Sequence, residues 1–470
     1  MRPSAILMNS FKEEDVYSKM DESLGLWNHI WHQNGKCPKK WALLQSHDDL
    51  VGGKARIAVW KPNVESGTNE FSSAQIWVVS NDHANGFSTL EVGWQVNPAL
   101  YKDSEPHFFI YWSGQDRRII DCVHIMDQPG LDHPLLKNHT VQMRPSAFLM
   151  NSFKDEDAYR KMNESLGLWN HIWRKDGKCP KNTVPIIRQT REDLLGEVSI
   201  KKKKQLPPLN RSYGGISNKH EWALIQSQGE VVGGKARIAV WKPYVEWGTN
   251  EFSLAQMWAV SDNHANGFST LEAGWQVYPA LYKDTEPHFF VYWTDDSYVK
   301  TGCYNSCPGF VQTNNEVVLG SVISPTSIYD GDQQEFLLQI SRDPVNKQWW
   351  LALNGVPVGY WPTETVKGMG ELARRIDFGG EIVNEGKGQH TTTEMGSGHL
   401  PDEGFKRAAY FSNIQTIDTS NQTRSGAENL IPLLTHGNCY TLIGGTVDRR
   451  PGGRGAFFYY GGPGRRSECP

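Results

Sequence analysis

Two glutamates stand in surroundings that would suit a catalytic carboxyl group. Glu272 lies in STLEAGWQVYP, where the alternation of a β-strand puts Glu272, Gly274 and Gln276 on one face. Glu381 follows Gly379–Gly380 in DFGGEIVNEG, at the start of another expected strand. A glycine beside a carboxylate on a strand face would leave room for a bound peptide backbone.

The chemistry open to such a pair is hydrolysis by an activated water. Two carboxylates brought close on a sheet surface cannot both ionise easily, so one holds a proton while the other stays charged. An acid and a base in one site can hydrolyse an amide without a covalent intermediate. From the pattern alone, an ordinary surface or turn residue is the simpler interpretation of each glutamate.

The sequence contains no motif for other kinds of catalysis. The sequence contains no G-x-S-x-G elbow, no H-E-x-x-H and no P-loop. His390 and His399 stand in a loop at a weak spacing for metal ligands, so we expect no metal and no cofactor. The net charge of −4 argues against a nucleic-acid partner. The run Lys201–Lys204 suits an exposed linker or processing site, and no segment approaches the ~20 apolar residues of a membrane span.

The elements that must position these glutamates are β-strands. From His220 onward, short segments alternate or run apolar between turns rich in Asn and Gly. They read KARIAVWKP, FSLAQMWAV, STLEAGWQV, HFFVYWT, FLLQISRD, QWWLALNG, VPVGYWP, GGEIVN, AAYFSNIQTID and GAFFYYGG. About a dozen strands without intervening helices predict antiparallel sheets packed as a sandwich. Thr365–Arg375 is the one good helix candidate of this region.

The chain also carries a partial duplicate of itself. Residues 1–113 reappear, interrupted and completed, at residues 143–294. For example, STLEVGWQV at Ser88–Val96 returns as STLEAGWQV at Ser269–Val277. The first copy stops near Ser113, whereas the second continues for most of a domain.

The two copies differ in their carboxylates. The first copy keeps Glu91, which matches Glu272, but nothing after it matches the segment of Glu381. We therefore predict that the first copy is inactive on its own. As half of a sandwich, it would also leave an open sheet edge and an uncovered apolar face.

From His220 to Pro470 the chain resembles the plant neprosin family, whose members include glutamic peptidases that cut after proline. The resemblance rests on KARIAVWKP, FSLAQMW, LEAGWQVYPALY, YWTDDSYVKTGCYNSCPGFVQ, VGYWP, FGGEIVN, TEMGSGHLPDEGF and FYYGGPGRRSECP. It implies an arched antiparallel β-sandwich with catalytic glutamates at Glu272 and Glu381. It also implies an active form released from a propeptide at acid pH. The stretch LDHPLLKNHTVQMRPS…GKCPKNTVPIIRQTREDLL is similar to the family's activation peptide.

These patterns divide the chain into five predicted segments. They are a duplicate pro-region fragment (1–39), a truncated copy of the sandwich (40–113), a small α+β pro-region that includes the activation peptide (114–195), a linker with a processing site (196–219) and the catalytic domain (220–470). Within the pro-region, Glu156–Leu168 shows a short helical pattern. The expected partners are peptide substrates and the pro-region itself, which would act as an intramolecular inhibitor.

The cysteines and sequons suggest an oxidising compartment. Of seven cysteines, Cys303 and Cys307 are close enough for a local disulfide, Cys439 and Cys469 could staple the C-terminus, and Cys37, Cys122 and Cys179 are left over. The resemblance supports both pairings. Glycosylation sequons stand at Asn138, Asn163, Asn210 and Asn421. The resemblance implies a secreted or vacuolar protein, although Met1–Asp15 lacks the apolar region of a signal peptide.

Two functions from different classes fit the sequence. The first is a glutamic endopeptidase made as a zymogen, in which Gln256 donates to the oxyanion and Trp258, Tyr292 and Trp293 wall a pocket for the proline ring. Core packing is the simpler role for each of these aromatics. The second is an inactive, Trp-rich β-sandwich that binds carbohydrate or peptide. Carboxyls of Glu272 and Glu381 within about one water's reach would favour catalysis, and carboxyls on opposite sheet faces would exclude it.

Overall fold

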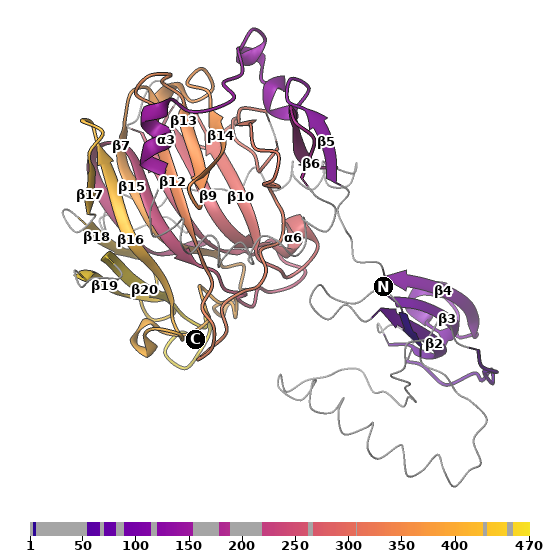
Figure 1. Cartoon of the computed structure of the whole chain (residues 1–470). Helices are drawn as coiled ribbons and strands as arrows, with labels where there is room; N and C mark the ends of the chain where they lie inside the picture. Colours follow the sequence, from indigo (N-terminus) through magenta and orange to yellow (C-terminus); the bar gives the residue numbers. More distant parts are fainter. Residues whose placement is uncertain are drawn as a thin grey trace. The chain divides into compact units, whose positions relative to one another are not determined.

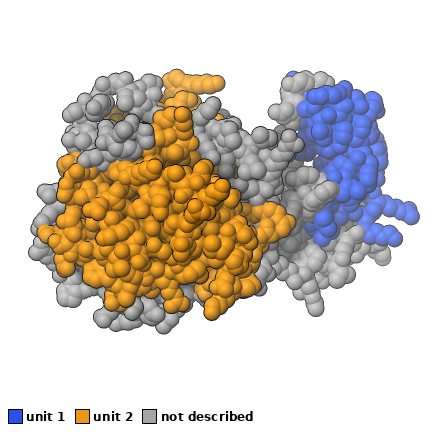
Figure 2. Space-filling model, turned by 90° about the horizontal axis from the view of Figure 1, so that it is seen from above, with its two compact units in different colours: residues 1–118 blue, residues 119–470 orange. Residues whose placement is uncertain are grey.

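The computed structural model describes residues 3–5, 54–65, 70–80, 89–113, 120–153, 178–188, 219–261, 267–306, 308–425, 430–448 and 455–470. The chain divides into two compact units, Met1–Arg118 and Ile119–Pro470 (Figure 2). The expected helix at Glu156–Leu168 and the lysine run at Lys201–Lys204 lie outside the described residues.

The larger unit contains a sandwich of antiparallel strands (Figure 1). Its strands are β7 (His220–Ala239), β8 (Ser253–Val260), β9 (Thr270–Val277), β10 (His288–Thr294), β11 (Val311–Gln312), β12 (Glu335–Arg342), β13 (Trp349–Leu353), β14 (Val356–Trp361), β15 (Ala373–Val383), β16 (Ala409–Asp418), β17 (Thr423–Ser425), β18 (Leu430–Leu434), β19 (Thr441–Asp448) and β20 (Gly455–Gly461). Every strand segment predicted from alternation falls on one of them, so the predicted antiparallel β-sandwich is confirmed.

One long strand, β7, belongs to both layers. Its residues 220–231 pair with β15, and its residues 233–239 pair with β12. The first layer therefore runs β10-β9-β8-β15-β7, and the second continues β7-β12-β13-β14-β11. Gly233 marks the change of partner: a Cβ there would lie 2.7 Å from the carbonyl oxygen of Ile340, so only glycine permits this close approach.

The two layers pack face to face around one apolar core. Phe289 on β10 meets Phe336 on β12 edge-on, with ring centroids 6.1 Å apart and planes at 90°. Trp275 from the first layer and Trp349 from the second are also fully buried in this core. Edge-to-face aromatic pairs of this kind add to the free energy gained from burial, so the aromatic residues hold the layers together.

The helix predicted at Thr365–Arg375 is wrong. The structure has only a 3₁₀ turn at Lys367–Met369, and β15 begins at Ala373. Gly370 follows the turn at φ 40°, a left-handed conformation that ends a helix. Gly368 and Gly370 both disfavour a helix, which outweighs the helix-forming residues around them.

The described part of the pro-region docks on the outer face of the second layer. Strands β5 (Ile120–His124) and β6 (Thr183–Ile187) pair with each other, and helix α3 (Ala147–Phe153) buries Phe153 against the side of β13 and β14 turned away from the core (Figure 1). Gln128 accepts a hydrogen bond from the backbone N–H of Gln312 at 2.7 Å and donates to its carbonyl oxygen at 3.0 Å. The docking is therefore both apolar and hydrogen-bonded.

The smaller unit is a single sheet that matches half of the first layer. Its strands, in spatial order, are β1 (Pro3–Ala5), β2 (Ser72–Ser80), β3 (Thr89–Val96) and β4 (His107–Ser113). The short helix α2 (Pro98–Tyr101) lies between β3 and β4 in the sequence. Gln75 pairs with Gly93 as Gln256 pairs with Gly274 in the larger unit. The duplicate has therefore kept the register of its counterpart.

Candidate functional site

The two candidate glutamates lie on the same face of the first layer. In β8, Trp258 pairs with Glu272 on β9, and Leu254 pairs with Glu381 on β15. Directly paired residues share a face, and every second residue of β8 returns to it. Glu272, Gln256 and Glu381 therefore share one side of the sheet, opposite to the inter-sheet core; we call it the glutamate face.

Gln256 stands between the two glutamates. It pairs with Gly274 on one side and with Gly379 on the other, so each glutamate is its diagonal neighbour. Two strand spacings and four residue positions separate the backbones of the two glutamates, which is about 10 Å across the sheet and about 13 Å along it. Gln256 on β8, the strand between them, therefore lies midway.

Three side chains surround the carboxyl group of Glu272, which is fully buried. Gln256 Nε2 donates to Oε2 at 3.0 Å, while the hydroxyls of Tyr298 and Thr270 donate to Oε1 at 2.6 Å and 2.8 Å. Burial and the neighbouring charge of Glu272 raise the pKa of Tyr298 well above its ordinary value, so its hydroxyl stays protonated. Glu272 is thus held in place by neutral donors.

Glu381 has a different partner, which the sequence analysis missed. Nδ1 of His220 lies 2.5 Å from Oε1 of Glu381, and both side chains are buried. His220 stacks on Trp222 with ring centroids 5.8 Å apart. Among the described residues, neither Oε2 of Glu381 nor Oε1 of Gln256 has a hydrogen-bond partner. The only sequence signal for His220 was its place two residues before Trp222, on the same strand face.

A third buried carboxyl, Asp377, was also missed. It pairs with Trp258, in the same row as Glu272. Its Oδ2 lies 3.3 Å from Gln226 Nε2 and 3.1 Å from Arg375 Nε, while burial raises the pKa of Asp377 to about 6. Alternation in DFGGEIV places it on the face of Glu381, and this signal was available in the sequence.

The glycines of this face do not leave the open space predicted from the sequence. A Cβ on Gly274 would lie 2.0 Å from the carbonyl oxygen of Ala255 and 2.7 Å from Cβ of Gln256. The room beside Gly274 is filled by β8, so this glycine serves the close approach of two strands. Any substrate backbone must lie above the row and not between the strands.

The aromatic candidates separate onto two faces. Trp258 and Tyr292 both pair with Glu272 and lie on the glutamate face, where Tyr292 packs on Tyr304 at 4.8 Å between centroids. Trp293 is the next residue of β10, so it points the other way and belongs to the inter-sheet core. Trp293 cannot line the same pocket as Tyr292, which corrects that expectation.

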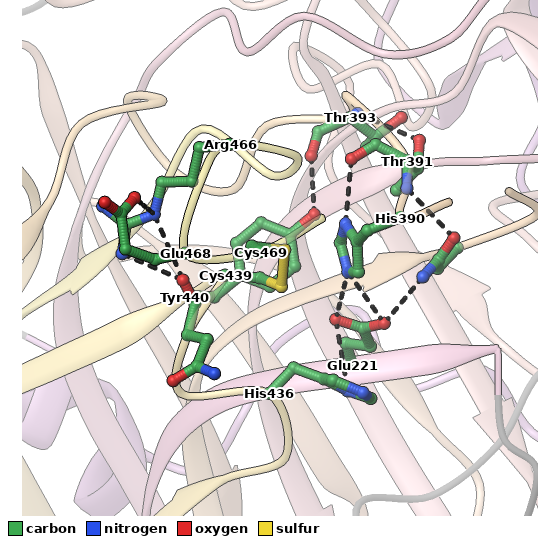
Figure 3. Close-up of a disulfide and its surroundings, with 12 residues drawn as sticks. Glu221, His390, Thr391, Thr393, His436, Cys439, Tyr440, Arg466, Glu468 and Cys469 are labelled. Carbon is green, nitrogen blue, oxygen red and sulfur yellow. Dashed lines mark hydrogen bonds and ion pairs between the residues drawn. A yellow bond between two sulfur atoms is a disulfide. The ribbon is translucent and has the colours of Figure 1, made fainter. Parts of the chain in front are cut away.

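A polar cluster lies at one end of the sandwich, beside the disulfide Cys439–Cys469 (Figure 3). His390 Nε2 lies 2.9 Å from Oε2 of buried Glu221, and His436 Nδ1 lies 3.4 Å from the same oxygen. Burial lowers the pKa of His390, but the hydrogen bond and charge of Glu221 outweigh it, so that the pKa is raised. A surface pocket opens here, and none of the three residues of the glutamate face lines it.

Neither candidate histidine of the loop is unpaired. His390 contacts Glu221, and His399 Nδ1 lies 3.0 Å from Oε1 of Glu403. Within the described residues, His390, Cys439 and Cys469 form one group whose side-chain ligand atoms lie within 4.8 Å of one another. Because the two sulfurs are joined to each other, they do not offer the thiolates that bind a metal.

The cysteines and sequons are only partly described. Cys439–Cys469 is present, and Cys122–Cys179, left unpaired by the sequence analysis, is a second disulfide. Cys303 is disulfide-bonded, while Cys307 lies outside the described residues, so their pairing stays a prediction. The sequon Asn138 is exposed and Asn421 is partly exposed; Asn163 and Asn210 lie outside the described residues.

Comparisons with known proteins give matches over both units. A family model described as Neprosin matches residues 68–130 and 249–463, and one described as Neprosin activation peptide matches residues 112–226. Among solved structures, scytalido-glutamic peptidase with a transition state analog inhibitor is 13% identical with a TM-score of 0.31, covering 51% of this chain and 97% of that one. SCP-B, a member of the Eqolisin family of peptidases in complex with the tripeptide Ala-Ile-His, is 10% identical with a TM-score of 0.28, covering 51% and 96%.

Proposed function

The chain belongs to the neprosin family, whose model matches more than half of it, and we propose that it is the precursor of a glutamic endopeptidase. The mature enzyme would cleave peptide bonds after proline at acid pH, with Glu272 and Glu381 activating a water. The activation-peptide match at residues 112–226 supports synthesis as a zymogen. The observation that carries the proposal is the shared, buried glutamate face, with Gln256 between the two carboxyls.

The placement of the two glutamates on either side of Gln256 suits an acid and a base acting from two sides of one peptide bond. A substrate bound over Gln256 would lie between them. The unpartnered Oε2 of Glu381 and Oε1 of Gln256 are buried polar atoms that need a partner, and a bound peptide with its water would provide one.

The different partners assign the two roles. His220 holds Oε1 of Glu381, while Oε2 has no hydrogen-bond partner among the described residues, so Oε2 is placed to take a proton from a water and Glu381 acts as the general base. Oε1 of Glu272 contacts the hydroxyls of Thr270 and Tyr298, and Oε2 contacts the amide of Gln256. We assign the role of general acid to Glu272, the other glutamate of this face.

The reaction then proceeds through water without a covalent intermediate. Oε2 of Glu381 takes a proton from the water, whose oxygen attacks the carbonyl carbon of the substrate. Glu272 gives its proton to the amide nitrogen as the carbon–nitrogen bond breaks. The amide of Gln256 lies beside both carboxyls, where its N–H can donate to the developing oxyanion in exchange for its bond to Glu272. Trp258 and Tyr292 are the candidate aromatics that share this face with the glutamates, where both are buried.

The surroundings of the site are part of the proposal. We propose a secreted or vacuolar protein whose pro-region restrains the peptidase; no helix of the described residues is long and apolar enough to cross a membrane. The smaller unit would be inactive. It keeps the Gln–Glu contact, with Gln75 Nε2 2.6 Å from Glu91 Oε2. In the place of β15, however, its described residues offer only the three-residue strand β1, which contains no glutamate.

The test is acid incubation of the full chain with a proline-containing peptide, followed by mass spectrometry of the products. The wild type and Glu91→Gln should cleave the peptide, whereas Glu272→Gln and Glu381→Gln should not. Equal cleavage by all four proteins would refute the glutamate mechanism. No cleavage by any of them, after the pro-region has been removed, would favour the alternative of a β-sandwich that only binds peptide or carbohydrate.

A further inference from the structure

The smaller unit exposes a row of large apolar side chains on one side of its sheet. They are Leu90 and Val92 on β3, and Phe108 and Ile110 on β4, which are 62%, 38%, 72% and 64% exposed. Val92 pairs directly with Ile110, and Phe108 pairs with Trp94, so these residues share one face. We call it the apolar face. Soluble proteins rarely leave such a contiguous patch open unless it contacts a partner.

The larger unit of the same chain shows what normally covers this face. The matching residues there are Leu271, Ala273, Phe289 and Val291, and each is at most 1% exposed. They lie in the core between the layers, where Phe336 on β12 covers Phe289. The apolar face is therefore the inner face of a sandwich, and the layer that completes it is a β-sheet with apolar side chains.

Most of that second layer is not available within the chain. Of its strands, only the end of β7 has a counterpart in the first copy, where Ile57 and Ala58 cover Trp94 at one end of the apolar face. The strands β11 to β14 follow residue 310, and the first copy ends before any match to them. Their inward side chains, such as Phe336 and Leu338, are already buried against the larger unit's own first layer. Among the described residues, the one other apolar sheet face of this register and twist is the same face on another molecule.

We propose that the smaller unit pairs face to face with the smaller unit of a second copy of the chain. Both partners would offer the same apolar rows, so a two-fold axis between them makes a self-complementary contact. Two sheets stacked about 10 Å apart would rebuild the sandwich that the duplicate lacks. This association is independent of the peptidase activity proposed for the larger unit.

The size of the face sets the strength to expect. Strands β2, β3 and β4 have 9, 8 and 7 residues. With strands ~4.8 Å apart and a rise of ~3.3 Å per residue, each face covers roughly 400 Å² in projection. Counted on both partners, the buried area is at most roughly 800 Å², below the ~1,000 Å² at which specific interfaces begin. The dimer should therefore be weak, form toward the upper end of the micromolar range and dissociate on dilution.

Sedimentation velocity of the full chain over about 1–100 µM tests the proposal. The wild type should shift from monomer to dimer over this range. Ile110→Lys and Phe108→Lys place a charge in the interface and should weaken the dimer at least tenfold. Leu100→Lys is the matched control: Leu100 is an exposed apolar residue of α2, outside the apolar face (59%). It should leave the dimer unchanged, and circular dichroism checks that every variant is folded.

Three outcomes would overturn the proposal. In the first, the wild type stays monomeric and binds a dye specific for apolar surface, which shows that the face is open. In the second, it stays monomeric and does not bind the dye, which shows that its own chain covers the face. A dimer that resists both Ile110→Lys and Phe108→Lys uses another surface. If both lysine variants unfold, crosslinking of mixed light- and heavy-isotope chains decides: links between Lys61 and Lys102 of different copies support the dimer, and their absence refutes it.

Discussion

His220 Nδ1 lies 2.5 Å from Oε1 of Glu381, and neither side chain is exposed to solvent. The imidazole of His220 fixes Oε1 of the buried carboxyl, which leaves Oε2 for a water. We therefore expect His220→Gln to lower kcat by about 10–100-fold while KM changes little, since His220 acts through Glu381.

The shape of the pH–rate profile separates a positioning role from a structural one. Loss of the His220–Glu381 contact should change the shape of the profile, because Glu381 then loses the partner that holds its Oε1. Trp222→Phe alters the stacking on His220 but keeps this contact, so it should keep the wild-type profile. A profile unchanged in His220→Gln would show that the pair only supports the fold.

A comparison of three carboxyls tests which of them does the chemistry. Glu381 and Asp377 lie on the same strand face, and Asp377 is in the row of Glu272. Glu272→Gln and Glu381→Gln should each reduce kcat/KM by roughly 10³-fold or more, as expected for a removed acid or base. Asp377→Asn should keep most of the activity. If Asp377→Asn abolishes cleavage and Glu381→Gln does not, the base is Asp377 and the assignment of Glu381 is wrong.

The strands could be predicted from the sequence, but several contacts at the site could not. Period-two alternation depends on adjacent residues, so it located β8, β9 and β15 and placed Glu272 on one strand face with Gly274 and Gln276. Alternation alone also separates Tyr292 from Trp293. The partner of Glu381 depends on pairing between β7 and β15, which are more than 150 residues apart, as the separation of 161 between His220 and Glu381 shows. No local pattern contains that information.

The disulfide Cys122–Cys179 was missed for a related reason. The two cysteines are separated by 57 residues, and an odd number of cysteines leaves the pairing open. The helix predicted at Thr365–Arg375 failed differently, because the two glycines and the following strand β15 override the local preference of that segment. Propensity is a weak prior where the tertiary pairing of a neighbouring strand decides the backbone.

The folded protein should be more stable in acid than at neutral pH. Burial raises the pKa of Asp377 from 3.8 to about 6, and the pKa of His390 lies above its ordinary value of 6.5. A raised pKa in the folded state means that folding favours the protonated form, so this stabilisation is complete below the unfolded pKa. It is lost as the pH rises through the folded pKa. Asp377 covers the window from about pH 4 to about pH 6, and His390 acts above pH 6.5.

Urea unfolding at several pH values measures this effect. In the wild type, the free energy of unfolding should fall by about 2–3 kcal/mol between about pH 4 and pH 6. Asp377→Asn should abolish this fall. His390→Gln should flatten the curve above pH 6.5, the ordinary value for histidine. The exposed carboxyl of Asp332 provides the control, and Asp332→Asn should keep the wild-type slope. An identical pH dependence in the wild type and Asp377→Asn would contradict the role given to burial.

The disulfide Cys122–Cys179 should control how firmly the pro-region is held. It ties strand β5 to the start of the segment leading into β6 and closes a loop of 57 residues. Loop-closure entropy gives such a crosslink about 4 kcal/mol of stability. Cys122→Ser with Cys179→Ser should therefore loosen β5 and β6, although Phe153 still packs on β13 and β14. In hydrogen exchange of the intact chain, residues 120–153 should lose protection, and acid incubation should release the pro-region faster.

The double variant Cys439→Ser with Cys469→Ser is the control. It opens the other described disulfide, which closes a loop of 30 residues, and should leave exchange in residues 120–153 unchanged. Equal protection of these residues in the wild type and the Cys122 and Cys179 double variant would mean that docking on β13 and β14 holds the pro-region without the crosslink.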